Sequence, residues 1–193
     1  MGHPRRHNAR CTCTVHDGAE SRYNPPMSHV EHRAEAPASI RVAVLTVSDT
    51  RTTQTDTSGA ALTELLEAAG HVVAGRGLLS DEAATVAAQV TAWLDDAGID
   101  AVITTGGTGI TSRDRTFEAI DALLEKRLDG FGELFRMLSY EEIGAAAMLS
   151  RATAGAARGT VVIALPGSEA AVRLAMTKLV LPELPHLVRE VKR

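Results

Sequence analysis

Three short runs of aliphatic and β-branched residues constrain the fold of this chain more than any other feature. They occupy residues 40–47, 100–105 and 160–165, and few charged side chains interrupt them. A strand with one exposed face alternates polar and apolar residues, whereas a strand covered on both faces is a nearly continuous apolar run. We therefore predict that these segments are central strands of a sheet with helices on both of its faces.

Segments with helical character separate these strands. Apolar residues recur every three or four positions in most of them, as expected for helices with one buried face. The predicted helices cover residues 58–69, 81–97, 116–124, 131–138 and 169–179, and a weaker strand covers residues 71–79. Strands that alternate with helices predict an α/β domain with a single doubly wound, mostly parallel sheet flanked by helices. We assign this domain to residues 39–193.

Residues 1–38 combine prolines, histidines and charged residues without apolar periodicity. We predict that they form a flexible tail, because such a segment cannot bury enough apolar surface to fold. Both cysteines lie here, and His7, Cys11, Cys13 and His16 raise the alternative of a zinc site. The Cys-x-Cys spacing is not usual for structural zinc, which favours the flexible tail.

Composition excludes several classes of function. The 193-residue chain has a formal net charge of -4 and only 3% aromatic residues, so it lacks the basic and base-stacking surfaces of nucleic-acid binders. No apolar run reaches the length of a membrane span, and the N-terminus lacks the apolar core of a secretory signal. We therefore expect a cytoplasmic protein that binds neither nucleic acid nor membrane.

Small, polar or acidic residues follow each predicted strand. Ser48-Asp49 follows the first strand, Asp81 follows the second, and Pro166-Gly167-Ser168 follows the last. The carboxyl ends of parallel strands meet at one edge of a sheet, where ligands bind, so the sequence predicts a binding site there. Each segment also has a structural alternative. Asp81 is favourable at the start of a helix because of the helix dipole, and Pro166-Gly167 is compatible with a simple turn.

The third strand runs into Thr104-Thr105-Gly106-Gly107-Thr108-Gly109, and Arg113 and Asp114 follow. The glycines remove side-chain bulk, so backbone N–H groups at 106–109 can approach an anionic ligand closely. Asp114 adds a candidate metal ligand. If Gly107 faces the ligand, Gly107→Ala should weaken binding with little effect on stability. The alternative is an ordinary glycine-rich turn closed by a surface pair between Arg113 and Asp114.

Common nucleotide-binding motifs are absent from this sequence. It contains no P-loop motif, and no acidic residue ends a following strand at the spacing that a Rossmann dehydrogenase requires. Ser58 and Gly59 either start a helix or bind phosphate at its N-terminus. We assign Phe131 and Phe135 to the core or to a subunit interface.

The glycine segment with Arg113 and Asp114 resembles the signature of the MoaB/Mog family of molybdenum cofactor biosynthesis proteins. Three further segments match in the same order, at residues 46–49, 56–59 and 165–168. Residues 130–139 are similar to the MoaB branch of the family. The resemblance extends over nearly the whole predicted domain and implies the molybdopterin-binding fold.

The resemblance implies that the chain binds molybdopterin and adenylylates its terminal phosphate with Mg-ATP. Asp81 and Asp114 match acidic positions that the family uses for catalysis, and we expect them to act through magnesium. The residues expected to bind substrate are Ser48, Asp49, Ser58, Gly59, Thr105, Gly106, Gly107, Thr108, Gly109, Arg113, Pro166, Gly167 and Ser168. The resemblance also implies a homotrimer or homohexamer, with other cofactor-biosynthesis proteins as candidate partners.

Two alternatives to an adenylyltransferase stay open at this point. One is a molybdopterin-binding carrier with little chemistry of its own, and the other is a non-enzymatic assembly module like the scaffold use of this fold in gephyrin. The presence of both Asp81 and Asp114 favours the enzyme, because neither alternative needs a pair of acidic residues.

Overall fold

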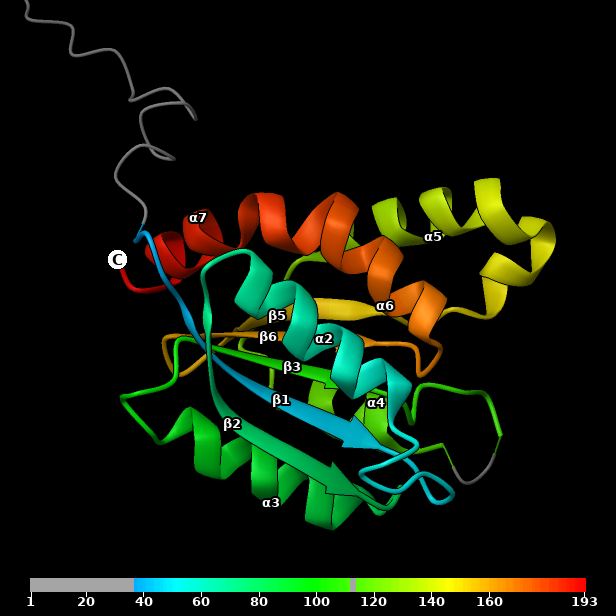
Figure 1. Ribbon diagram of the computed structural model, residues 1–193, viewed down its shortest axis with the longest axis horizontal. Coiled ribbons are helices and arrows are strands. Elements are labelled where there is room, and N and C mark those ends of the chain that lie inside the picture. Colours follow the sequence, from blue (N-terminus) through cyan, green and yellow to red (C-terminus); the bar gives the residue numbers. More distant parts are fainter. Residues whose placement is uncertain (1–36, 112–113) are drawn as a thin grey trace, which may run out of the picture.

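The computed structural model describes residues 37–111 and 114–193. Residues 1–36 of the predicted tail, with the alternative zinc site, lie outside these ranges, and so does Arg113. Within them the chain forms one six-stranded sheet with helices on both faces (Figure 1). This arrangement confirms the predicted fold class.

The sheet has the strand order β2-β1-β3-β6-β5-β4. Its parallel part contains β1 (Arg41–Val47), β2 (Val72–Leu79), β3 (Ala101–Thr105) and β6 (Thr160–Leu165). The strands β5 (Thr153–Ala157) and β4 (Lys126–Arg127) add an antiparallel edge. The chain places β2 on one side of β1 and β3 on the other, so the strand order reverses between β1 and β3. Such a reversal opens a crevice at the carboxyl ends of the strands.

Helices cover both faces of the sheet. The helices α3 (Ala83–Leu94) and α4 (Thr116–Asp121) lie below it in Figure 1, and α2 (Thr57–Ala68), α5 (Asp129–Ile143), α6 (Glu169–Ala175) and α7 (Leu181–Val191) lie above it. A 3-10 helix, η1 (Gly144–Leu149), follows α5, and a π-helical turn, η2 (Met176–Val180), joins α6 to α7. Among the helices of the described residues, none has the length and apolar character that a membrane span requires.

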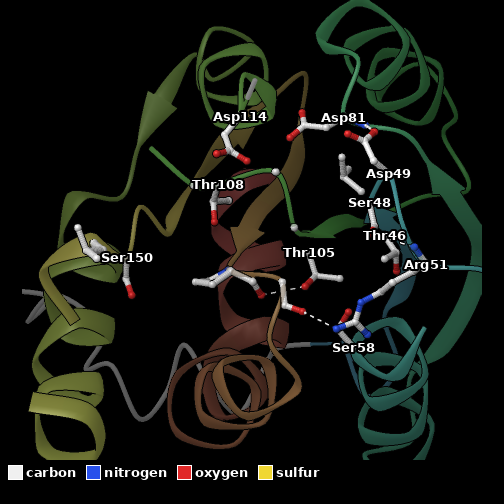
Figure 2. A pocket seen from close by; sticks show the side chains of 17 residues that line it. Thr46, Ser48, Asp49, Arg51, Ser58, Asp81, Thr105, Thr108, Asp114 and Ser150 are labelled. Carbon is white, nitrogen blue, oxygen red and sulfur yellow. Dashed lines mark hydrogen bonds between the residues drawn. The ribbon is translucent and has the colours of Figure 1, made fainter. Parts of the chain in front are cut away.

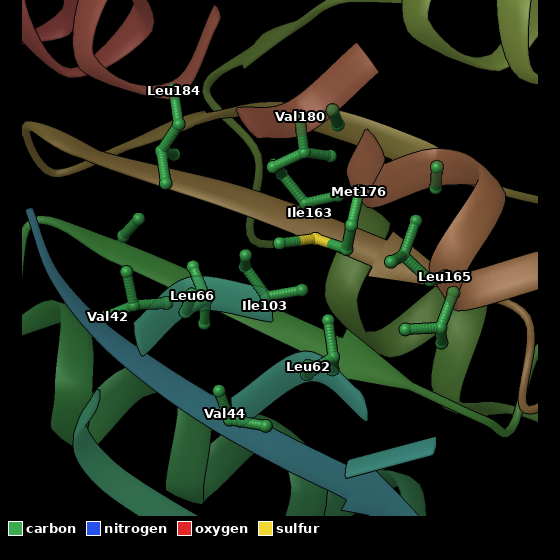
Figure 3. Close-up of a cluster of buried hydrophobic side chains, with 14 of the residues drawn as sticks. Val42, Val44, Leu62, Leu66, Ile103, Ile163, Leu165, Met176, Val180 and Leu184 are labelled. Carbon is green, nitrogen blue, oxygen red and sulfur yellow. The ribbon is translucent and has the colours of Figure 1, made fainter. Parts of the chain in front are cut away.

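Alternate residues of the central strands pack on opposite faces of the sheet. Val42 and Val44 belong to the core above the sheet, where they share a cluster with Leu66 of α2 (Figure 3). Ala43 and Leu45 belong to the core below it. All of these side chains are buried. Burial on both faces explains why the β1 segment is almost continuously apolar.

The antiparallel edge strands β5 and β4, the 3-10 helix η1 and the C-terminal helix were not predicted from the sequence. The strand β5 is missed because its residues, Thr-Ala-Gly-Ala-Ala, have little β propensity. A Cβ atom on Gly155 would lie 2.3 Å from the carbonyl oxygen of Lys126, so a small residue is needed for close approach to β4. The helix predicted at 169–179 continues through η2 and α7 to Val191. The α7 segment was not predicted to be helical because it contains Pro182 in its first turn and Pro185 in its interior.

Candidate functional site

A pocket of about 450 Å³ opens where the carboxyl ends of β1, β3 and β6 meet (Figure 2). It lies at the strand-order reversal between β1 and β3, the position at which open α/β sheets bind ligands. The lining residues are Thr46, Val47, Ser48, Asp49, Arg51, Ser58, Asp81, Thr105, Gly106, Gly107, Thr108, Gly109, Asp114, Leu149, Ser150, Pro166 and Gly167.

Most of the residues predicted for the site therefore lie around one cavity. Gly59 and Ser168 do not line it, and both take part in hydrogen bonds at helix starts. The Gly59 N–H donates to Asp56 Oδ1 at 2.8 Å, and Ser168 Oγ accepts from the Ala171 N–H at 3.2 Å. The pocket is also lined by five residues that were not predicted from the sequence, namely Thr46, Val47, Arg51, Leu149 and Ser150. Of these five residues, only Arg51 could have been suggested by the sequence, because it lies in the polar loop that follows β1.

Gly106 is required where β3 turns into the pocket. Its φ is +96°, and a Cβ atom there would lie 2.1 Å from the carbonyl oxygen of Val47. Its N–H donates to the Leu165 carbonyl at 3.0 Å and is therefore not available to a ligand. Of the predicted anion donors, the N–H groups of 107–109 are left. They donate no hydrogen bond within the part of the chain that the structure describes.

The structure corrects the expectation for Gly107. A Cβ atom there would lie 2.4 Å from Thr116 Cβ and 3.1 Å from Asp81 Oδ2, at a φ of +64°. The substituent would thus meet protein atoms before it met a ligand. Gly107→Ala would strain the fold as well as the site, so the predicted small effect on stability is wrong.

Asp81 is held against the glycine loop. Its backbone N–H donates to Asp49 Oδ1 at 3.0 Å, and its Oδ1 accepts from Thr116 Oγ1 at 2.7 Å. Thr116 is fully buried at the start of α4. The helix after Asp81 begins at Ala83, and its N-cap residue is Glu82. The Glu82 side chain makes no capping hydrogen bond to the helix. The Asp81 carboxylate is therefore oriented by α4 and the loop, and it caps no helix.

Asp114 lies against the same loop at Gly109. Its Oδ2 accepts from the Thr111 N–H at 2.9 Å and from Thr111 Oγ1 at 2.5 Å. A Cβ atom on Gly109 would lie 2.4 Å from Asp114 Oδ2, so glycine is needed there to admit the carboxylate. Gly107 and Gly109 therefore make room for Asp81 and Asp114, respectively.

Arg151, which precedes β5, fixes the outer part of the loop. Its Nε donates to the Thr108 carbonyl at 3.0 Å, and its Nη2 donates to the carbonyls of Gly109 and of Asp114. The same guanidinium lies over the Phe117 ring, with Cζ 4.8 Å from the ring centroid, and pairs with Glu118. The hydrogen bond from Arg151 lowers the pKa of Glu118. These bonds hold the loop carbonyls on the Arg151 side.

A buried carboxylate, Asp56, supports the site from beneath. Its Oδ1 accepts from the Gly59 N–H and, at 3.3 Å, from Ser58 Oγ. Its Oδ2 accepts from Thr46 Oγ1 at 2.8 Å and pairs with Arg76 at 3.3 Å. Burial alone would raise the pKa of Asp56, but these hydrogen bonds outweigh it and hold the pKa below its usual value. Asp56 thereby ties β1, α2 and β2 together next to the pocket.

The acidic residues of the pocket fit a magnesium ion that arrives with a nucleotide. In the ranges that the structure describes, no group of three or more His, Cys, Asp or Glu side chains is gathered as a metal site. Magnesium commonly uses one or two protein carboxylates and completes its oxygen ligands with water and substrate phosphates. Asp81 lies against Gly107 and Asp114 against Gly109, both along one edge of the pocket (Figure 2), and both offer such oxygens.

Comparisons with known proteins agree with this geometry. Residues 43–186 match a family described as a probable molybdopterin binding domain. Over 168 residues the chain is 52% identical to molybdenum cofactor biosynthesis protein B of Bacillus subtilis (strain 168), with 86% of this chain and 99% of that protein covered.

Solved structures of similar proteins share the fold. A crystal structure of a molybdenum cofactor biosynthesis protein B has a TM-score of 0.79 at 51% identity, with 81% of this chain and 98% of that chain covered. The tungsten cofactor synthesizing protein MoaB from Pyrococcus furiosus has a TM-score of 0.73 at 38% identity, with 82% and 100% covered.

Proposed function

This chain belongs to the molybdopterin-binding domain family of molybdenum cofactor biosynthesis, and from that premise we propose that it adenylylates molybdopterin. In the proposed reaction an oxygen of the pterin's terminal phosphate bonds to the α-phosphorus of ATP. The bond from the α-phosphorus to the bridging oxygen breaks, and pyrophosphate leaves with the electron pair. The nucleophile is itself a phosphate, so no side chain has to be activated.

The observation that carries this proposal is the pair of carboxylates that lie against Gly107 and Gly109 of the glycine loop. A site that only bound pterin would have no need for Asp81 and Asp114 to be oriented by dedicated hydroxyl donors, Thr116 and Thr111. Two negative charges beside an anion-binding loop repel phosphates unless a cation lies between them. This arrangement therefore favours chemistry on a magnesium–nucleotide complex over pterin binding alone.

The chain's own contribution to the reaction is positioning. The N–H groups of 107–109 would donate to phosphate oxygens, and Arg151 keeps the neighbouring carbonyls from turning toward them. Phosphoryl and nucleotidyl transfer depend mainly on such positioning and on neutralisation of charge. Asp81 and Asp114 would hold the magnesium ion, which supplies charge neutralisation at the phosphates when bound.

The test is incubation of the full chain with molybdopterin and Mg-ATP, followed by chromatographic detection of adenylylated pterin and released pyrophosphate. We expect a one-to-one yield of the two products that requires magnesium. Tight pterin binding without either product would overturn the enzyme and support the carrier. If the chain neither binds molybdopterin nor forms product, the assembly module is the interpretation that is left.

We further propose that the chain forms homotrimers or homohexamers through the outer surface of α5 and η1. Several large apolar side chains are exposed there, namely Leu134, Met137, Tyr140, Ile143, Met148 and Leu149. An exposed apolar patch of this kind on a monomer marks an interaction surface. Light scattering of the parent and of Met137→Glu tests this assignment, because a buried charge at the interface should dissociate the assembly.

A further inference from the structure

The pocket contains a second arginine-centred arrangement that the reaction described above does not use. Arg51 lies in the loop between β1 and α2, and its side chain lines the pocket beside Ser58 (Figure 2). We propose that the Arg51 guanidinium binds the phosphate monoester of the pterin substrate. The anion site itself rests on the charge and geometry of Arg51, and the choice of the pterin phosphate over the nucleotide phosphates rests on the proposed function.

The position of Arg51 is fixed at both its backbone and its side chain. Its backbone N–H donates to Ser48 Oγ at 3.2 Å. Its Nη1 donates to Thr57 Oγ1 at 2.8 Å and to the Thr55 carbonyl at 3.3 Å, and its Nη2 donates to the Gly167 carbonyl at 3.5 Å. These partners come from the loop itself, from α2 and from the segment after β6. The guanidinium is thus preorganised, so a ligand would lose little binding energy in ordering it.

The positive charge of Arg51 has only neutral partners. All the acceptors of its guanidinium are hydroxyl or carbonyl oxygens. Other arginines of the chain pair with carboxylates: Arg76 with Asp56, Arg151 with Glu118, Arg158 with Asp95, and Arg173 with Glu64 and Glu169. An arginine fork that faces a cavity without a carboxylate partner is suited to an incoming carboxylate or phosphate.

The arrangement of charge across the pocket indicates which phosphate Arg51 binds. Figure 2 shows Asp81 and Asp114 on one side of the cavity and Arg51 with Ser58 on the other. The nucleotide phosphates carry magnesium and belong beside the carboxylates. A phosphate that carries no metal belongs beside Arg51, and the pterin monoester is the other phosphate in the reaction. This placement brings nucleophile and nucleotide together from opposite sides of one cavity.

The experiment compares four proteins by titration calorimetry: the parent, Arg51→Gln, Arg51→Lys and Arg158→Gln. The Arg158 variant is the control, because it removes the same charge from an arginine in the turn between β5 and β6 that does not line the pocket. The ligands are molybdopterin, the same pterin after enzymatic removal of its phosphate, and inorganic phosphate. Thermal unfolding of every variant reports on the fold.

We expect Arg51→Gln to bind molybdopterin at least tenfold more weakly, with unchanged affinity for the dephosphorylated pterin. Arg51→Lys should lose less, because the charge stays while the fork is lost, and Arg158→Gln should match the parent. Equal losses for both pterins would overturn the assignment and make Arg51 a support of the loop. Unchanged molybdopterin affinity in Arg51→Gln would overturn it as well.

Failure of the proposed function gives a different result. If the parent binds no pterin but binds inorganic phosphate more tightly than Arg51→Gln does, the anion site stands and the pterin substrate is wrong. If Arg51→Gln does not fold, the salt dependence of molybdopterin affinity in the parent and Arg51→Lys decides. Affinity that falls with ionic strength for the phosphorylated pterin alone supports the site, and equal salt dependence for both pterins overturns it.

Discussion

Replacement of the buried carboxylate of Asp56 should test how strongly the base of the pocket depends on one side chain. Asp56 caps α2, accepts a hydrogen bond from Thr46 on β1 and pairs with Arg76 on β2. It is only 4% exposed, so water cannot replace these partners without a local opening. We expect Asp56→Ala to destabilise the protein and to disorder the β1–α2 loop at the pocket.

The size of the effect follows from the separate contacts. Loss of an N-cap costs about 1 kcal/mol. Thr46 is only 2% exposed. Its hydroxyl would lose its acceptor, and an unsatisfied buried hydroxyl costs about 1–3 kcal/mol. Arg76 is 42% exposed in its side chain, so its ion pair contributes about 0.5 kcal/mol or less. The total is about 3 kcal/mol, which corresponds to a fall of about 6–12 °C in Tm for a domain of this size.

Asp56→Asn separates the charge from the cap. Asparagine caps helices about as well as aspartate, so we expect a smaller loss of about 1–2 kcal/mol at neutral pH. The pKa of Asp56 is lowered in the folded protein, so the charged form stabilises the fold above the usual aspartate value of 3.8. That contribution is lost as the pH falls through the lowered pKa. The stability difference between parent and Asp56→Asn should therefore shrink below about pH 4.

Urea unfolding at several pH values, followed by circular dichroism, measures these differences. A loss below about 1 kcal/mol for Asp56→Ala would contradict the structural role of Asp56, because the cap alone should contribute that much. A parent–Asn difference that grows on acidification would refute the sign of the pKa shift. Arg158→Gln, which removes an exposed ion pair, should change stability by no more than about 1 kcal/mol and serves as the control.

Three further predictions concern the site and the tail. Asp114→Asn should lower turnover about 100-fold or more with little change in pterin affinity, as measured by steady-state kinetics and calorimetry; an unchanged rate would exclude a metal role. Arg151→Met should raise KM and lower stability by about 2 kcal/mol. Glu118→Gln keeps the bonds from Arg151 to the loop carbonyls and should change both much less, so equal effects of the two variants would contradict the loop-fixing role of Arg151. A chain cut to residues 39–193 should keep its Tm and pterin affinity, and a loss of several kcal/mol would show that the removed segment is structural.

Local sequence was sufficient for the central strands and for most of the pocket edge. Continuous apolar runs identify β1, β3 and β6, since burial on both faces removes polar residues from a strand. The β2 strand gave a weaker signal for a physical reason. Cβ atoms on Gly75 and Gly77 would lie 3.1 and 3.0 Å from Trp93 Nε1 and Leu45 Cδ1, so a larger residue at either position would push on a side chain of α3 or β1.

The type of each central element and the polar residues that follow it can be predicted from the sequence, because both depend on neighbours a few positions away. The atoms that those residues contact depend on how distant segments of the chain come together. Arg151 reaches the glycine loop across 43 positions and Arg51 reaches Gly167 across 116, and no local pattern encodes such pairs. The missing Cβ of Gly107 likewise makes room for Asp81, which follows another strand. Contacts at that separation arise only when the sheet brings the carboxyl ends of its strands together.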